Sequence, residues 1–338
     1  MKHRSLHLIR RRIKDQILQL GFTARNSLFE CNPHSRDYKT ADLCCSLLRG
    51  VDFIRRHQRE DGALIDFLLP IGSSDGWMTA HVAWVVEEVP ELERVRHKAA
   101  GYLNWLGNES NGVWGYNTLV GNDCDSTAQA LLVLHNAGYK VPSSWVMELA
   151  AQQHANGGYS TFRKHKLFPN GWQIPHPDVT LVVVAALRRL GIAPEAQLRA
   201  TKWIDALDNA SELIPYWWSS PAYIYWCSMR TGRHSSKVSK FLSNTLPSAT
   251  TVPDLAMLTW ASLREKGWSN DTLSGVNRLI SLQRNDGSWP CSPCLRLTNP
   301  AIMAPKVNAP GTIYSGQRRN FSTAHAVAAL SFANLCTR

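Results

Sequence analysis

The sequence lacks a long hydrophobic run, a secretory leader and a dense set of cysteines. Its longest apolar stretch, 180-TLVVVAAL-187, is far shorter than a helix that spans a bilayer. The first residues have neither a continuous apolar core nor a cleavage site of small residues, so we expect a cytoplasmic protein. Eight cysteines are scattered through 338 residues, unlike the framework of a small disulfide-rich domain. We therefore expect free thiols.

Metal-binding and nucleic-acid-binding motifs are also scarce. Cys291 and Cys294 form a single CxxC pair, without a second pair or well-spaced histidines. No motif of a known nucleic-acid-binding module occurs. We expect no metal site and no nucleic-acid partner.

Acidic residues are few relative to basic ones. The chain has 26 Asp and Glu against 37 Lys and Arg, which gives a formal net charge of +11. Much of the excess lies in 2-KHRSLHLIRRRIKDQILQLG-21, where apolar residues recur at helical spacing. Residues 1–40 therefore have two interpretations: a basic helix packed on the rest of the chain, or a helix in peripheral contact with the inner surface of a membrane.

Tryptophan, in contrast, is abundant. Hydrophobic residues make up 44% of the chain and charged residues 19%, as in packed globular proteins. The 13 Trp outnumber both the nine Tyr and the nine Phe. This excess indicates that flat aromatic surfaces have a use in the molecule.

Repeated segments run through most of the chain. Each has a short polar or aromatic start, then Thr or Ala, then an apolar helix. The six copies are 75-DGWMTAHVAWVV-86, 123-DCDSTAQALLVL-134, 178-DVTLVVVAALRRLG-191, 221-PAYIYWCSM-229, 253-PDLAMLTWASLREKG-267 and 320-NFSTAHAVAAL-330. Between them a Gln- or Asn-containing helix end is followed by a Gly turn and an aromatic residue, as in 57-HQREDG-62, 152-QQHANGGY-159 and 283-QRNDGSW-289.

Helical hairpins that repeat every roughly 50 residues predict an all-α fold. We expect residues 41–338 to form a single (α/α)6 barrel of six inner and six outer helices, with an open superhelix as the structural alternative. A closed barrel would gather the N-termini of the inner helices at one end, around a central cavity.

The stretch 121-GNDCDSTAQALLVLHNAG-138 places Asp123 and Asp125 just before one of these apolar helices. Either residue could cap the helix, and capping is one interpretation of the pair. Two carboxylates one residue apart repel each other, and burial raises their pKa further, so the pair is expected to share a proton although the helix N-terminus favours the anion. The second interpretation is a catalytic acid, because a protonated carboxyl in an apolar cavity can protonate an alkene and aromatic faces stabilise the resulting carbocation.

These motifs resemble those of a known enzyme family. The segment 123-DCDSTA-128 resembles the DxDD-type acid motif of class II terpene cyclases, the protonation-initiated group that includes squalene-hopene cyclases, with Ser126 in the place of the fourth Asp. The segment 283-QRNDGSW-289 is similar to the QW motif of the same superfamily. The resemblance extends over about residues 40–338, enough for one helical domain, as in the single-domain cyclases that act on prenylated aromatic acids.

The resemblance implies roles for single residues. Asp125 would be the catalytic acid and Asp123 its carboxylate neighbour. Asp178 matches the Asp of a D-x-T-x-H pattern that orients the acid, but Val182 stands at the position of the histidine. The remaining candidates for holding the acid are Ser126, Asn122, a water molecule and a histidine of another helix.

Aromatic and histidine residues near the predicted helix starts are expected to line the cavity. His81 and His325 stand at equivalent places in two repeats, two residues after Thr79 and Thr323. The predicted wall residues are Trp77, His81, Trp172, Tyr223, Tyr225, Trp226, Trp260 and His325. The Pro- and Asn-rich stretch 291–311 is either a lid over this cavity or a surface loop.

The resemblance implies a lipophilic isoprenoid substrate, foremost a prenylated aromatic acid, and no cofactor. A linear prenyl diphosphate, which could bring Mg²⁺ with it, and a squalene-like triterpene are alternatives. Protein prenyltransferases share the repeats, but their zinc ligands are replaced by Ala256 and Ser322. Two further alternatives are a non-catalytic helical-repeat binding protein and a glycosidase, which paired acids at i and i+2 fit poorly.

Overall fold

The computed structural model describes residues 38–163, 170–210, 213–303 and 311–337. Contacts divide the chain at residue 41, and the description concerns the unit formed by residues 42–338. The predicted basic helix of residues 1–40 falls almost wholly outside the described residues, so both of its interpretations stay predictions.

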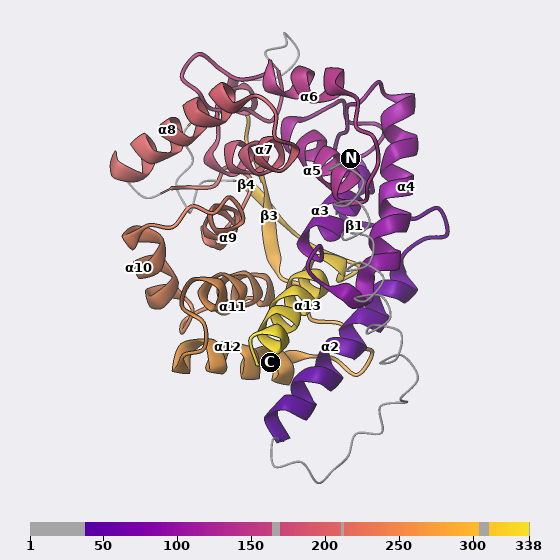
Figure 1. The fold of residues 1–338 in the computed structure, drawn as a ribbon, viewed down its shortest axis with the longest axis vertical. Helices are drawn as coiled ribbons and strands as arrows, with labels where there is room; N and C mark the ends of the chain where they lie inside the picture. Colours follow the sequence, from indigo (N-terminus) through magenta and orange to yellow (C-terminus); the bar gives the residue numbers. More distant parts are fainter. Residues whose placement is uncertain (1–37, 164–169, 211–212, 304–310, 338) are drawn as a thin grey trace, which may run out of the picture. The chain divides into compact units, whose positions relative to one another are not determined.

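Across the described residues the chain is mainly helical, with twelve α-helices (Figure 1). Six of them correspond to the predicted inner helices: α3 (Gly76–Val85), α5 (Cys124–Asn136), α7 (Pro177–Leu190), α9 (Ala222–Arg230), α11 (Val252–Lys266) and α13 (Asn320–Leu335). Each of these ring helices contacts the next, and α13 contacts α3, so together they form a closed ring. They are apolar on most sides, and most of their residues are buried.

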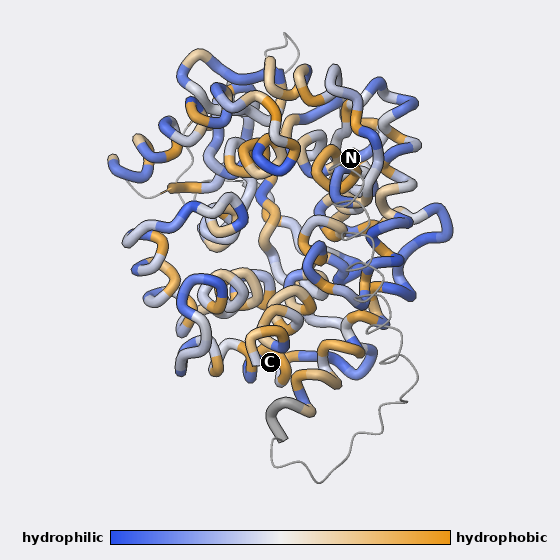
Figure 2. Tube along the Cα trace, viewed as in Figure 1, coloured by the Kyte–Doolittle hydropathy of each residue, from blue (hydrophilic) through white to orange (hydrophobic). Residues whose placement is uncertain are grey.

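Six further helices pack against this ring from outside. They are α2 (Tyr38–His57), α4 (Glu93–Glu109), α6 (Ser143–Ala150), α8 (Pro194–Ala210), α10 (Ser236–Thr245) and α12 (Asn270–Leu282). Helix α4 contacts α3 and α5, α6 contacts α5 and α7, and α12 contacts α11 and α13. Two short 3-10 helices, η1 (Pro90–Leu92) and η2 (Asn170–Gln173), lie in the connections. In Figure 2 hydrophilic colours gather in the turns and on the outer helices, whereas α13 is mostly hydrophobic.

The Gln-containing turns join neighbouring repeats by side-chain amides. In each turn the Nε2 group of Gln donates to the carbonyl of the following Gly and to a carbonyl of an outer helix. The bonds run from Gln58 to Gly62 and Val95, from Gln153 to Gly157 and Ala196, and from Gln283 to Gly287 and Ser46. Each Gln side chain therefore bonds its own turn to an outer helix. Through Gln283, the turn that follows α12 is bonded to α2, the first of the outer helices.

The residue after each Gly turn is fastened to the ring by a threonine. Its backbone N–H donates to the Oγ1 atom of the Thr that anchors the next repeat. The four bonds are Leu64 to Thr79 (2.8 Å), Trp114 to Thr127 (3.0 Å), Tyr159 to Thr180 (2.9 Å) and Trp289 to Thr323 (3.2 Å). The indoles of Trp114 and Trp289 also donate to carbonyls of outer helices, so these aromatics pack against the outer helices.

Two small antiparallel sheets depart from the all-α prediction. Strands β1 (Asp66–Leu69) and β2 (Gly72–Ser74) form one hairpin, and β3 (Pro293–Thr298) and β4 (Gly311–Ser315) form the other. Strand β4 contacts β1, and Leu295 of β3 pairs with Trp218. The segment predicted as a lid or a surface loop is therefore in part a buried strand, while residues 304–310 lie outside the described part.

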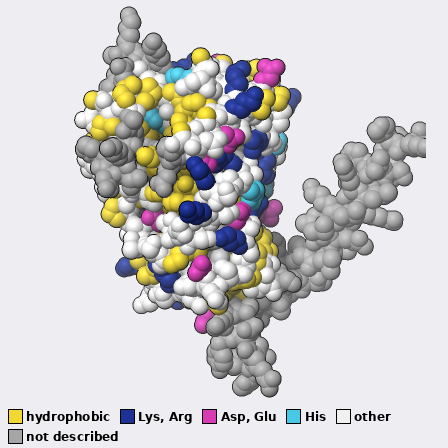
Figure 3. Space-filling view, turned by 90° about the vertical axis from the view of Figure 1, so that its left-hand side faces the viewer, with side chains coloured by type: hydrophobic (Ala, Val, Ile, Leu, Met, Phe, Trp, Pro, Cys, Tyr) yellow, Lys and Arg dark blue, Asp and Glu magenta, His cyan; other side chains and the backbone are white. Residues whose placement is uncertain are grey.

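No helix in the described part of the chain is long and apolar enough to cross a bilayer. Among the described cysteines, the free thiols include Cys44, Cys124, Cys227, Cys291, Cys294 and Cys336. On the face drawn in Figure 3, basic side chains are spread among hydrophobic groups and do not form a single patch.

Candidate active site

An apolar cavity of about 440 Å³ lies at the end of the ring where α3 and α5 begin. Its mouth includes Leu69 to Ile71 from the β1–β2 hairpin and Leu119 to Gly121 from the loop before α5. One wall consists of Leu295 to Leu297 of β3. Asp123, Asp125 and Ser126 line it from the start of α5, so the segment singled out in the sequence belongs to this cavity.

The two aspartates have different places at the start of α5. Asp123 is the N-cap residue, and its carboxylate accepts hydrogen bonds from the backbone N–H (2.7 Å) and the hydroxyl (2.8 Å) of Ser126. Asp125 is two residues further on, and its buried Oδ1 atom has no hydrogen-bond partner among the described residues. Asp123 therefore satisfies the helix end, which leaves Asp125 without a capping role.

Both carboxyl groups hold protons more tightly than usual. Burial raises the pKa of Asp125 well above its ordinary range, and the neighbouring charge and hydrogen bond of Asp123 raise it further. Burial also raises the pKa of Asp123, but the hydrogen bonds from Ser126 oppose this. The shared proton therefore lies on Asp125, as a donor toward Asp123.

Ser126 and Asn122, both predicted to support the acid, differ in what they do. Ser126 holds Asp123, and through it the partner of the acid. Asn122 is exposed in the loop before α5 and is not part of the cavity wall, so the structure assigns it no contact that would hold the acid.

Asp178 lies close to the pair but has a different set of contacts. It is buried at the start of α7, and its Oδ2 atom accepts backbone N–H groups of Tyr216 and Trp217, each at 3.0 Å. Burial raises the pKa of Asp178 to about 6, although the hydrogen bonds from the two backbone N–H groups oppose this rise. Asp178 thus positions the 216–218 segment, of which Trp217 and Trp218 line the cavity.

Arg296 is a cavity residue that sequence reasoning missed. It is 1% exposed, and it lines the cavity from β3. Burial lowers the pKa of Arg296, while the negative charge of Asp178 raises it. No sequence motif surrounds Arg296, since it lies in the stretch predicted as a lid or a surface loop. Alternation in 293-PCLRLT-298 was the one available signal for a strand.

Aromatic rings form much of the wall, and only some of them were predicted. Trp77 and Trp172 line the cavity as expected. The structure adds Tyr116, Phe162, Trp217 and Trp218. The indole of Trp217 donates to the Oγ1 atom of Thr161 (2.6 Å), and Trp172 contacts both Trp217 and Phe162.

The other six predicted wall residues do not line this cavity. Tyr225 stacks on Phe241 of outer helix α10, and Trp260 packs against Phe332. His81, Tyr223, Trp226 and His325 are buried deeper in the ring. Tyr223 starts α9 at the level of the cavity, but the Trp218 ring stacks on it and covers it. His81 and His325 do not reach the cavity because each lies one helical turn below that level.

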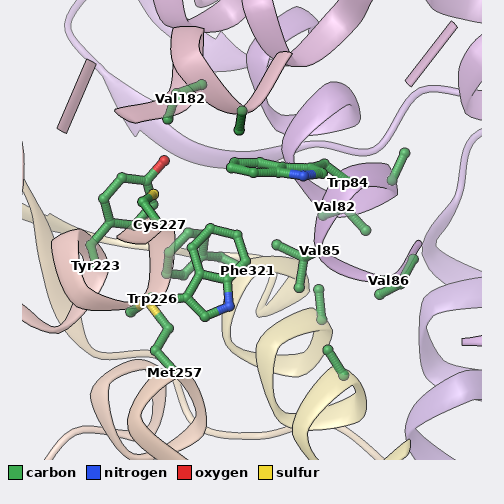
Figure 4. Close-up of a cluster of buried hydrophobic side chains, with 14 of the residues drawn as sticks. Val82, Trp84, Val85, Val86, Val182, Tyr223, Trp226, Cys227, Met257 and Phe321 are labelled. Atoms are coloured by element: carbon green, nitrogen blue, oxygen red, sulfur yellow. The ribbon is translucent and has the colours of Figure 1, made fainter. Parts of the chain in front are cut away.

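The deeper layer is a hydrogen-bonded group in an aromatic box. The Nε2 atoms of His81 and His325 are 3.0 Å apart, and Nδ1 of His81 is 3.0 Å from Oε1 of Gln129. Burial lowers the pKa of His81 to about 3 and that of His325 well below its ordinary value, so both imidazoles are neutral. Figure 4 shows Trp84, Tyr223, Trp226 and Phe321 gathered in the same part of the core.

The described residues contain no group of three or more His, Cys, Asp or Glu side chains that could hold a metal ion. The cavity can instead present a protonated carboxyl to an apolar ligand and surround that ligand with aromatic faces.

No family model matches the sequence, and no curated protein matches it. Solved structures do. The apo type II terpene cyclase MstE from Scytonema has a TM-score of 0.75 at 20% identity over 88% of this chain and 99% of its own. MstE structures also exist with geranylgeranyl dihydroxybenzoate as substrate and with merosterolic acid A as product.

Two other solved structures are more distant. An ent-copalyl diphosphate synthase from Streptomyces platensis has a TM-score of 0.51 at 15% identity over 76% of this chain and 50% of its own. An unsaturated glucuronyl hydrolase specific for heparin has a TM-score of 0.54 at 13% identity over 86% of this chain and 96% of its own. The chain thus has the fold of type II terpene cyclases. The fold of the glucuronyl hydrolase is similar.

Proposed function

We propose that the chain is a class II terpene cyclase built on an (α/α)6 barrel, in which Asp125 protonates the terminal alkene or epoxide of a polyprenyl chain. One observation carries the proposal: a carboxyl group whose pKa is strongly raised, with a buried and unpartnered oxygen, lies in the wall of an apolar aromatic cavity. The structural similarity to MstE supports the same function, because the two proteins share a fold.

The proposed reaction begins with proton transfer from Asp125. Its O–H bond breaks as a C–H bond forms at the end of the chain, which leaves a carbocation that the next alkene attacks. Asp123 accepts a hydrogen bond from Asp125, and its negative charge keeps Asp125 protonated until the substrate alkene takes the proton. The aromatic faces stabilise the moving positive charge, and loss of a proton ends the cascade. Solvent then returns a proton to Asp125. None of these steps needs a metal ion.

We further propose that the substrate is a prenylated aromatic acid. Arg296 is a buried cation in a wall that is otherwise mostly apolar, and it would repel a carbocation but attract an anionic head group. A benzoate offers the planar pair of oxygens that a guanidinium binds best. The substrate of MstE, geranylgeranyl dihydroxybenzoate, belongs to this class. A prenyl diphosphate is the second candidate, since Arg296 would attract it too.

The paired acids set this proposal apart from its alternatives. A glycosidase needs two carboxyl groups on either side of a sugar bond, whereas Asp123 and Asp125 share a single proton at one helix end. A binding protein without catalytic activity would have no use for a buried, protonated acid in the wall of its site.

The decisive experiment compares wild type, Asp125→Asn and Asp254→Asn in buffered D₂O with EDTA. Each protein receives farnesyl- and geranylgeranyl-bearing benzoates, geranylgeranyl diphosphate and squalene, and products are identified by mass spectrometry. We expect wild type and Asp254→Asn to form a cyclic isomer with a single deuterium, and Asp125→Asn to form about a thousandfold less or none. Asp254 is the matched control because burial raises its pKa as well, although it does not line the cavity.

Equal product from Asp125→Asn would return both aspartates to the role of helix caps. If wild type bound the prenyl compounds and cyclised none of them, the binding-protein alternative would hold.

The head group is tested by replacing Arg296 with Met. We expect Arg296→Met to raise KM for the prenylated benzoate by at least about tenfold and to leave KM for its methyl ester unchanged, because only the acid pairs with the guanidinium. Arg94→Met, an exposed position on α4, is the control. An equal loss for acid and ester would show that Arg296 shapes the wall without binding the head group.

A further inference from the structure

Trp218 belongs to two groups of residues at once. Its side chain lines the cavity, and on its other side it stacks on Tyr223 (4.1 Å between ring centroids) and on Phe321 (5.2 Å). Tyr223 and Phe321 start the ring helices α9 and α13, at the level where Asp125 starts α5. Trp218 therefore covers the part of the ring that would otherwise be open between these helices.

The backbone holds Trp218 firmly in this place. Trp218 pairs with Leu295 of β3, the N–H of Ser219 donates to the carbonyl of Cys294 (2.9 Å), and the N–H of Arg296 donates to the carbonyl of Trp217 (2.7 Å). On the other side of the segment, Asp178 accepts the N–H groups of Tyr216 and Trp217. Because the backbone of this segment is hydrogen-bonded on both sides, the position of the indole in the cavity wall is fixed.

Behind Trp218 lies the pair of neutral imidazoles. The rings of His81 and Trp218 are 6.4 Å apart, and His81 stacks on Phe321 at 5.0 Å. A neutral imidazole is a base. A carbocation within reach of His81 would therefore lose a proton before cyclisation was complete. The indole thus separates the cavity from a basic group.

We propose that Trp218 is the specificity residue that closes the inner end of the cavity and sets the length of prenyl chain that the protein accepts. The inference rests on the proposed function for the chemical class of its ligand. Removing the indole would leave a space on the order of 150 Å³, a size that holds a benzene molecule in other proteins. An isoprene unit is slightly smaller than benzene, so the space fits one more unit of the chain.

The test measures chain-length preference with benzoates that carry geranyl, farnesyl, geranylgeranyl and geranylfarnesyl chains. Wild type, Trp218→Ala, Trp218→Phe and Trp172→Ala are compared by kcat/KM for cyclisation. Affinity for the same series is measured by calorimetry on proteins that also carry Asp125→Asn, so that binding is read without turnover. Trp172 is the matched control because its indole also lines the cavity. It contacts Phe162 and Trp217, and not the rings on which Trp218 stacks.

We expect Trp218→Ala to shift the preferred chain by one isoprene unit, with a change of at least about tenfold in the ratio of the two kcat/KM values and of the two affinities. Trp218→Phe, which keeps a ring over Tyr223, and Trp172→Ala should keep the preference of wild type. The same preference in Trp218→Ala and wild type would overturn the inference, as would an equal shift in Trp172→Ala. If no protein cyclised any compound but the affinities shifted as expected, the inference would stand and the proposed function would fail.

Discussion

Asp123 receives two hydrogen bonds from Ser126, whereas the Oδ1 atom of Asp125 receives none from the described residues. The difference follows from position, because only the N-cap residue can reach the free N–H groups of the first helical turn. Asp123 caps the helix, whereas Asp125, two residues later in the chain, stays protonated in the apolar wall of the cavity. The same four residues thus contain the helix cap and the carboxyl group that we propose as the acid.

The raised pKa of Asp178 makes a testable link between this site and stability. Burial raises its pKa to about 6 from 3.8, so between these values the folded protein holds a proton that the unfolded chain has lost. The contribution of Asp178 to stability is therefore complete below pH 3.8 and falls as pH rises through 6, by roughly 3 kcal/mol in total. Asp178→Asn keeps an oxygen for the two backbone N–H groups but does not titrate.

We expect the free energy of unfolding of wild type, relative to Asp178→Asn, to fall by roughly 2 to 3 kcal/mol between pH 4 and pH 7. The difference between the two proteins is needed because neutral His81 and His176, with pKa values of about 3, act in the opposite direction: their contribution is present above pH 6.5 and is lost as pH falls. Urea unfolding at several pH values measures it. Parallel curves for the two proteins would show that Asp178 is ionised in the folded state.

Among the elements, the ring helices were predictable and the strands were not. The ring helices repeat one pattern, in which a Thr at a fixed place accepts the N–H of the residue after a Gly turn, as Thr127 does for Trp114 and Thr323 does for Trp289. Such bonds join neighbours in the sequence and leave a periodic trace. Strand β3 has no such trace, since it pairs with Trp218 across a long separation along the chain.

The residues of the candidate site also fall into those that the repeats predicted and those that they did not. Asp123, Asp125, Asp178 and Trp77 all stand at the start of a ring helix, so one register argument places them at the same level. Arg296 and Trp218 come from irregular or strand segments, and only the folded chain brings them there. The predicted wall residues that failed, such as His81, had the right register but lie beneath side chains that sequence periodicity does not reveal.

On the scale of the whole unit, the ring is held at its far end by one buried cation. Arg230 ends α9, and it donates to Glu87 (2.6 Å) and to the carbonyls of Trp84 (3.3 Å) and Val85 (2.8 Å) at the end of α3. Helices α3 and α9 are the first and fourth members of the ring, so this side chain connects opposite sides of it. Its guanidinium also lies over the rings of Trp226 (4.8 Å) and Trp260 (4.7 Å).

We expect Arg230→Met to lower the free energy of unfolding by about 3 to 5 kcal/mol, because Met fills the space but leaves Glu87 buried without its closest cation and leaves two helix-end carbonyls without a donor. Adding Glu87→Gln should restore part of the loss. Arg56→Met is the control, since its bond to Asp52 is exposed and should be worth at most about 1 kcal/mol. Urea unfolding compares the variants. A loss in Arg230→Met no larger than in Arg56→Met would mean that the helix contacts alone close the ring, and that the tie between its opposite sides is dispensable.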